Sequence, residues 1–403
     1  MLTLVEKILF VIAVAVSLHF TWGGVRRMIK IIARGQGKPD WNLVIKKAGD
    51  GLLKFLTFRT VFRFRLGTSL VHAFIGWGFT YFILVNLGDV LQAYIPGFKF
   101  LGSGPIGNLY RLLADLFALA VVGGVIFMAI RRFVFKPAIL TARETTLLDP
   151  KARLGIKRDS AIVVAFITLH VGSRLMGESF LLGAEGAPDR WQPVASMVAR
   201  LWAGIDPGAL EIGWHACFWL SLGLVLAFLP YFPYSKHIHL FFAPLNFMFK
   251  PKRRSIGELG YLNLDDPALE QFGASRLEHL GYEQIMDSYA CIMCFRCQEV
   301  CPAYNTGKIL SPAALEINKR YTLNAEGAKI AAGAESKPLT DLIPAEAIWA
   351  CTSCGACVDI CPVGNEPMRD ILDIRRALVL MENNFPKRWE TAFRGMERNA
   401  NPW

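Results

Sequence analysis

The stretch Cys291-Ile-Met-Cys294-Phe-Arg-Cys297-Gln-Glu-Val-Cys301-Pro302 decides the fold, because its spacing is repeated once later in the chain. The repeat places the same run, four cysteines closed by a proline, at Cys351, Cys354, Cys357, Cys361 and Pro362. Thiolates are soft ligands, and this run is typical of bacterial [4Fe–4S] proteins, in which the fourth cysteine binds the other cluster. We therefore predict a first cluster held by Cys291, Cys294, Cys297 and Cys361. A second cluster is predicted to be held by Cys351, Cys354, Cys357 and Cys301.

Two other uses of the cysteines were weighed. Zinc is normally bound by C-x2-C pairs that a longer loop separates, and not by a run of four with a closing proline. A disulfide framework conflicts with the cytoplasmic placement that the membrane topology predicts below. The ninth cysteine, Cys217, lies in an apolar run and is expected to pack as a small apolar residue.

The composition indicates a membrane protein. Of the 403 residues, 53% are hydrophobic and 19% are charged, whereas soluble proteins carry about 25% charged residues. A disordered chain, a collagen-like chain and a disulfide-rich miniprotein are excluded. Runs of about 20 apolar residues can cross a bilayer, and five such runs occur, at 4–22, 67–87, 109–130, 161–182 and 212–231.

The distribution of the net charge of +11 predicts the topology. Basic residues crowd the segments between spans one and two and between spans three and four, while the other two loops carry only Lys99, Arg190 and Arg200. By the positive-inside rule the amino terminus lies outside and everything after Tyr231 lies in the cytoplasm. The excess of lysine and arginine over acidic residues is then expected to lie next to anionic lipid of the plasma membrane. Nucleic acid is not an expected partner. The first run lacks a cleavage site and is interpreted as a span.

Histidines concentrate in the membrane half, where ionisable residues are costly and usually functional. Estimated depths pair His72 with His239 near the inner face and His170 with His215 in the outer half. Two facing imidazoles can ligate a haem, so we predict b haem, with two haems as the working number. The alternative for any single histidine is a hydrogen bond to a neighbouring helix. His19 has no partner at its depth and is interpreted as structural.

Arg174 and Glu178 form an i, i+4 pair in span four and are the candidates for a quinone site. The arginine could hold a haem propionate and the glutamate could accept a quinol proton. A mutual ion pair is the alternative. Asp89, Arg111 and Asp115 are similar candidates near the outer face.

These assignments give an all-α chain with three parts. Residues 1–231 form a five-span haem domain, 232–280 a proline-broken and basic linker at the membrane surface, and 281–403 a helical ferredoxin domain. Ser311 as N-cap and Pro312 at the first position predict a helix over 313–321, and apolar spacing predicts another over 368–381.

Further residues carry a family resemblance: Tyr-Ser-Lys-His-Ile-His-Leu at 234–240 with Pro244 and Asn246, then Tyr289-Ala-Cys, Cys301-Pro-Ala-Tyr and Cys361-Pro-Val-Gly-Asn-Glu-Pro. Together with the order of parts, they resemble the heterodisulfide-reductase-related membrane iron–sulfur proteins with a nitrate-reductase-gamma-like haem b domain. Within them the chain is most similar to electron-transfer-flavoprotein:menaquinone oxidoreductases. In that family the Ser-Lys-x-x-His element supplies a haem ligand, which favours His239 over His237.

The resemblance implies a quinone-linked oxidoreductase, acting as a subunit of a complex in the respiratory chain. Its donor would be an electron-transfer flavoprotein or a cysteine-rich subunit, and menaquinone its acceptor. Family members often continue into a cysteine-rich domain, and this chain ends at Asn401-Pro402-Trp403, so that domain is expected in a separate subunit or to be absent. The alternatives are quinol-driven reduction of a thiol–disulfide partner and a purely electron-conducting anchor. A transporter is disfavoured, since the spans show no Gly/Pro-broken pairs.

Overall fold

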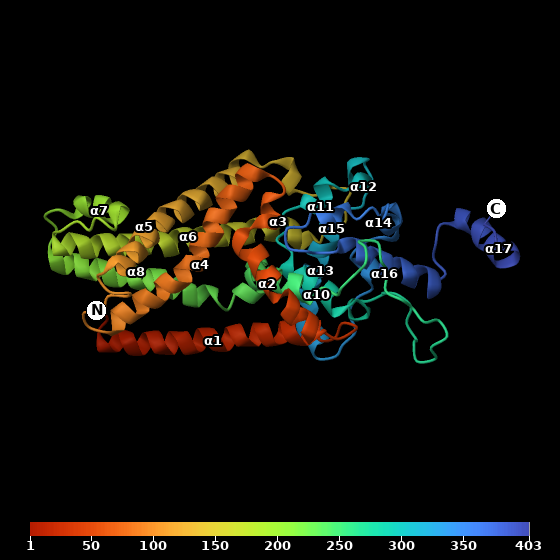
Figure 1. The fold of residues 1–403 in the computed structure, drawn as a ribbon, viewed down its shortest axis with the longest axis horizontal. Coiled ribbons are helices and arrows are strands. Elements are labelled where there is room, and N and C mark those ends of the chain that lie inside the picture. Colours follow the sequence, from red (N-terminus) through yellow and green to blue (C-terminus); the bar gives the residue numbers. More distant parts are fainter. Residues whose placement is uncertain (403) are drawn as a thin grey trace. The chain divides into compact units, whose positions relative to one another are not determined.

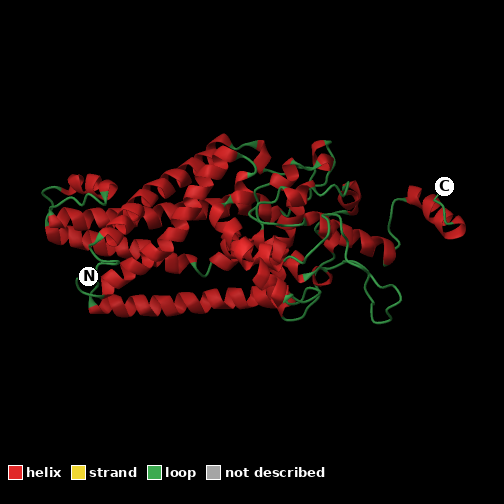
Figure 2. Cartoon of the chain, viewed as in Figure 1, coloured by secondary structure: helices red, strands yellow, loops and turns green. Residues whose placement is uncertain are grey.

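The computed structural model describes residues 1–402, and every regular element within them is helical (Figure 2). The predicted all-α class is therefore confirmed. The chain divides into a first unit (residues 1–26, 53–140 and 153–238) and a second unit (27–52, 141–152 and the chain from 239). The boundaries expected after residues 231 and 280 stay a prediction, and Trp403 lies outside the described residues.

Five helices long and apolar enough to cross a membrane occur, as the hydropathy predicts. They are α1 (Leu4–Ile32), α4 (Leu66–Tyr94), α5 (Pro105–Ala129, continued by a π-helical turn to Phe135), α6 (Pro150–Glu185) and α8 (Pro207–Phe228) (Figure 1). Helix α6 begins well before its apolar run because Pro150 suits a first helical position and the charged residues after it are helix formers. The short helices α3 (Arg59–Phe62) and α7 (Pro193–Ala199) complete the first unit.

Helices α4 and α5 pack closely because alanines and a valine of α5 lie against larger apolar side chains of α4. Ala114, Ala118 and Val121 of α5 are buried against Phe82 and Val85 of α4. Outward-facing apolar side chains remain more than half exposed, among them Leu4, Ile83, Leu119 and Ile212. An apolar exterior of this kind is what a lipid environment requires of a helical bundle.

The second unit is built from shorter helices. They are the start of α2 (Trp41–Thr57), α9 (His239–Phe249), α10 (Tyr282–Ala290), α11 (Arg296–Glu299), α12 (Pro302–Asn305), α13 (Pro312–Ala331), α14 (Ala345–Ala350), α15 (Ala356–Asp359), α16 (Pro367–Leu380) and α17 (Glu390–Asn399). The predicted start of α13 is confirmed, since Ser311 Oγ accepts a hydrogen bond from Ala314 N at 3.1 Å. The helix continues ten residues past the predicted end at 321.

Two helices contradict the sequence interpretation. Residues 41–57 belong to the basic segment between spans one and two, for which no helix was predicted, and Pro244 was expected to break the linker. Instead α2 buries Val44 and Gly51, and α9 runs through Pro244. The two helices stabilise each other, because Gly51 lies against Met248 and Trp41 packs edge-on to Phe249 with ring centroids 5.5 Å apart. Tertiary packing has overridden local preference here.

The close approach of α4 and α5 yields a first prediction. A Cβ atom on Gly78 would lie 2.2 Å from Val121 Cγ2, and the stiff β-branched valine cannot move aside cheaply. We expect Gly78→Ala to lower the free energy of unfolding in detergent by about 1 to 3 kcal/mol. Gly123→Ala is the matched control, since a Cβ there meets nothing within 4 Å. Equal stability of the two variants would contradict the packing argument.

Candidate metal centres

A first thiol cavity is formed in the second unit where α10 ends. Cys291 and Cys294 line it from the loop that joins α10 to α11, Cys297 lines it from α11, and Cys361 lines it from the second motif. The remaining lining is largely apolar and is contributed by Ile292, Met293, Phe295, Ala313, Pro362, Val363 and Pro367, with Glu316 as the one acidic side chain in this set.

A second thiol cavity repeats the arrangement after α14. Cys351, Cys354 and Cys357 line it together with Cys301 of the first motif. Cys357 lines both cavities, so the two thiol sets are neighbours. The structure thus brings together the residues of each predicted set, while the ligand assignment itself stays a prediction. Within residues 1–402 no three or more His, Cys, Asp or Glu side chains converge as ligands of a single metal ion would.

The two cysteine loops share an unusual backbone. Met293 and Phe295 in the first loop have φ of +54° and +60°, and Ser353 and Gly355 at the matching positions have φ of +55° and +75°. Left-handed residues turn the chain tightly, and only glycine adopts this conformation without steric cost. The loops therefore wrap inward, so that consecutive thiols point toward one cavity.

The electrostatics of the thiols suit a cationic iron centre. Burial raises the pKa of the Cys291 and Cys297 thiols well above the ordinary value, and burial with the neighbouring Cys294 raises the pKa of Cys361 to about 12. Thiols of this kind stay protonated until a metal replaces the proton. Backbone N–H groups already point at sulfur, from Ser353 to Cys351 Sγ at 3.4 Å and from Asn365 to Cys361 Sγ at 3.2 Å. The donor set fits [4Fe–4S] clusters.

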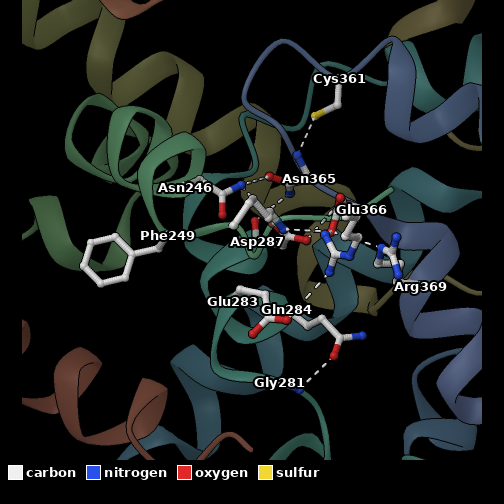
Figure 3. A network of polar contacts seen from close by, with 12 residues as sticks. Asn246, Phe249, Gly281, Glu283, Gln284, Asp287, Cys361, Asn365, Glu366 and Arg369 are labelled. Carbon is white, nitrogen blue, oxygen red and sulfur yellow. Dashed lines mark hydrogen bonds and ion pairs between the residues drawn. The ribbon is translucent and has the colours of Figure 1, made fainter. Parts of the chain in front are cut away.

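A buried polar network lies beside Cys361 and is centred on Asp287 of α10 (Figure 3). The carboxylate of Asp287, fully buried, accepts hydrogen bonds from Asn246 Nδ2 at 2.8 Å, Lys250 Nζ at 2.7 Å and Glu366 N at 2.9 Å. Residues 246–250, Asp287 and Glu366, which are far apart in sequence, therefore meet at the Asp287 carboxylate.

The same network reaches the first thiol set. Asn365 donates its side-chain N–H to the Asp287 carbonyl at 2.6 Å and its backbone N–H to Cys361 Sγ. Asn246 Nδ2 also lies 3.0 Å from the Val363 carbonyl oxygen. The Asp287 network therefore fixes the loop that carries Cys361. Sequence reasoning noted Asn246 only as part of a resemblance and missed Asp287 altogether.

In the first unit, two of the predicted haem ligands are oriented through Nδ1. His170 Nδ1 lies 3.0 Å from the Ser221 carbonyl oxygen, and His215 Nδ1 lies 2.8 Å from Glu6 Oε1. Trp219 Nε1 donates to the same Glu6 oxygen at 3.2 Å. A partner on Nδ1 holds an imidazole in the tautomer whose Nε2 can bind metal. The residues present fit a haem ligand role.

The other histidines are placed as follows. His72 belongs to α4 of the first unit and packs edge-on to Phe58 with ring centroids 5.8 Å apart. His239 begins α9 of the second unit, whereas His237 lies in the first unit. His19 packs edge-on to Phe20. The pairing of His72 with His239 stays a prediction.

Arg174 forms an ion pair with Asp89 that the sequence did not predict, in addition to the i, i+4 contact with Glu178. Its guanidinium donates to both carboxylate oxygens of Asp89, at 2.8 and 3.2 Å, and lies 3.4 Å from Glu178 Oε1. Gln192 Nε2 donates to the other Glu178 oxygen at 2.7 Å. Asp89, Arg174 and Glu178 line a cavity among α4, α6 and α8, whose other walls include Ser173, Gly177, Trp214, Cys217 and Phe218.

The remaining two candidates, Asp115 and Arg111, have structural partners. Asp115 accepts hydrogen bonds from the backbone N–H groups of Val194 and Ala195 at the start of α7, at 2.6 and 3.0 Å. Arg111 pairs with Asp189 at 3.1 Å. A carboxylate at a helix amino terminus is electrostatically favourable, so Asp115 holds α7 in place.

The fold and the thiol cavities define a helical protein with candidate membrane spans and a dicluster iron–sulfur domain. Residues 287–365 match the family model of the 4Fe-4S dicluster domain. The chain is 29% identical over 374 residues to the probable iron-sulfur-binding oxidoreductase FadF of Bacillus subtilis, covering 83% of this chain and 50% of that protein. It is 30% identical over 365 residues to the EtfAB:quinone oxidoreductase of Syntrophomonas wolfei, covering 83% and 49%.

A probable membrane-anchored ferredoxin of Chromohalobacter salexigens is 32% identical over 187 residues, which are 41% of this chain and 28% of that protein. No solved structure matches. The predicted resemblance to membrane iron–sulfur oxidoreductases is confirmed by these relatives. The chain spans about half the length of the first two of them.

The Asp287 network yields a second prediction. Asp287→Ala removes the carboxylate 2.7 Å from the buried Lys250 ammonium and leaves Glu366, 3.6 Å away, as its counter-charge. Breaking a buried ion pair by removing one partner costs about 3 to 5 kcal/mol. We expect a loss of that size in the free energy of unfolding of the full chain. Asp341→Ala, at an exposed position, is the control and is expected to change stability by less than about 0.5 kcal/mol. Similar losses in both variants would contradict the role of the network.

Proposed function

We propose that the chain is the electron-transferring part of a membrane-bound oxidoreductase that connects a soluble donor with the quinone pool. The cofactors are two [4Fe–4S] clusters and b haem, with menaquinone as the quinone. The donor is an electron-transfer flavoprotein or a cysteine-rich partner subunit. The amino terminus lies outside the plasma membrane and the dicluster domain lies in the cytoplasm. The names of the Bacillus subtilis and Syntrophomonas wolfei relatives support this class of activity.

The observation that carries the proposal is the division of eight thiols into two neighbouring sets. Each set combines three thiols of one motif with the last thiol of the other, and Cys357 lines both cavities. When bound, clusters at such sites supply one-electron carriers whose potentials respond to charge, hydrogen bonding and solvent exposure. Neighbouring one-electron carriers are suited to electron transfer rather than to hydrolytic or structural roles.

Burial within the second unit supports a direction of approach. Cys354 is exposed, as are Thr352 and Ser353, so a soluble partner can reach the second thiol set. Cys361 of the first set packs with Ala243 and Phe242 of α9, the helix that begins at His239. The second set is thus the side for the soluble partner, and the first set is the side of the predicted haem ligand His239.

Haem at His170 and His215 is supported by their engaged Nδ1 atoms. The convergence of Arg174, Asp89 and Glu178 beside apolar residues of α8 supports a quinone site next to these groups. In it Glu178 is the group positioned to exchange a proton, and Arg174 is the group that orients it.

Metal analysis is the test of the iron–sulfur proposal. The purified full chain is expected to contain about eight irons and matching acid-labile sulfide for two cubanes. Cys361→Ala is expected to lose about half of that iron, because Cys361 belongs to only one set. Cys217→Ala, outside both cavities, is expected to lose none. Stoichiometric zinc in place of iron overturns the proposal.

Visible spectroscopy tests the haem proposal. The purified protein is expected to show a b-type spectrum on reduction, and His170→Ala or His215→Ala to remove about half of the haem absorbance. His19→Ala is the matched control and is expected to leave the spectrum unchanged, since His19 contacts only its neighbour Phe20 among the aromatic pairs. A wild-type protein without haem absorbance rejects the histidine pairing.

A further inference from the structure

The dicluster domain contains a second repeated feature besides the cysteines, an arginine set over an aromatic ring. Tyr289 and Trp349 each stand two positions before the first cysteine of their motif. The Arg320 guanidinium lies 4.6 Å from the Tyr289 ring centroid, and that of Arg375 lies 5.4 Å from the Trp349 centroid. The two arginines occupy the same position in α13 and α16, counted from the proline that begins each helix.

All three guanidinium nitrogens of Arg375 donate hydrogen bonds to the second cysteine loop and the end of α14. Nη2 donates to the carbonyl oxygens of Ile348 at 2.8 Å and Cys351 at 2.5 Å, and Nη1 donates to Ser353 Oγ at 3.1 Å. Nε donates to Ile348 as well, at 3.2 Å. A planar fork with several donors in fixed directions specifies geometry in a way that an ammonium cannot.

These bonds lead directly to a thiol. Ser353, held at a left-handed φ of +55°, points its N–H at Cys351 Sγ. The matching residue in the first loop is Met293, which has no hydroxyl for an arginine to bind. Arg375 therefore has a contact to its loop that the first motif cannot reproduce.

The second cavity also differs from the first in its charge. Among the described residues, no aspartate or glutamate lines this cavity. Glu316 by contrast lines the first cavity, where its carboxylate lies 3.2 Å from the ammonium of Lys319. The electrostatic surroundings of the two thiol sets are therefore different.

We propose that Arg375 is a positioning residue of the second cluster, which holds the Cys351–Ser353 loop and raises the reduction potential of that cluster. Reduction adds one electron, and hence one negative charge, to a cluster already surrounded by thiolates. A half-buried cation next to it stabilises the reduced form more than the oxidised form. The inference rests on the proposal that Cys301, Cys351, Cys354 and Cys357 bind a [4Fe–4S] cluster.

The experiment is a redox titration with dithionite of the purified full chain, followed by electron paramagnetic resonance. The signal of the second cluster is assigned with Cys354→Ser, which alters that cluster only. Arg375→Gln is expected to lower the equilibrium constant for reduction of the second cluster about tenfold, equivalent to about 59 mV for one electron. The first cluster keeps its potential. Arg375→Lys, which retains the charge, is expected to stay within about threefold of wild type.

Arg376→Gln is the matched control, because Arg376 lies next to Arg375 but bonds Asp373 and the Gly260 carbonyl instead of the cysteine loop. It is expected to shift neither cluster. An unchanged second potential in a fully loaded Arg375→Gln protein overturns the inference, and so does an equal shift in Arg376→Gln. If the Arg375→Gln protein binds no second cluster, Arg375→Lys is the test of the charge. A tenfold fall in the equilibrium constant for reduction of the second cluster in Arg375→Lys overturns the role of the charge.

Failure of this inference is distinguishable from failure of the proposed function. A wild-type protein with about eight irons and two reducible clusters, but no response to Arg375→Gln, removes only the role of Arg375. A wild-type protein without cluster signals removes the proposed function first.

Discussion

The second unit depends on one buried charge, the carboxylate of Asp287. A carboxylate that is removed from water is tolerated only where hydrogen bonds and an opposite charge surround it. Here Asn246 comes from α9, Lys250 directly follows that helix, and the Glu366 N–H belongs to the N-cap of α16. The charge is therefore satisfied by groups that these elements bring together. The position of Cys361 follows from that arrangement, because its loop is held by the same groups.

Charged side chains in the first unit are also matched by an opposite charge or by hydrogen bonds. Arg174 is matched by Asp89 of another helix, and Asp115 is matched by the free N–H groups at the start of α7. In a lipid-exposed bundle an unmatched charge would be costlier than in a soluble domain, so each pair fixes how its helices meet. His215 and Glu6 follow this pattern and join α8 to α1.

The sequence predicted what depends on local spacing and failed where distant residues meet. Motif spacing predicted the loops that carry the thiols, and the Ser311 and Pro312 signals predicted the start of α13. Helix α9 was not predicted, because the tendency of proline to interrupt helices is a local rule. It does not include the contact with α2, which packs against this helix. The contact of Arg375 with the Cys351 loop was not predictable either, because no periodicity links a helix residue to a carbonyl oxygen on another element.

The exchange of the last thiol between the two motifs has a consequence for biogenesis. Cys361 lines the first cavity and Cys301 the second, so neither thiol set is complete until both motifs have been synthesised. A nascent chain that has emerged from the ribosome only as far as the first motif offers three sulfurs of one set and a single sulfur of the other. If each cavity holds the proposed cluster, neither cluster can gain its full set of thiol ligands until both motifs have left the ribosome.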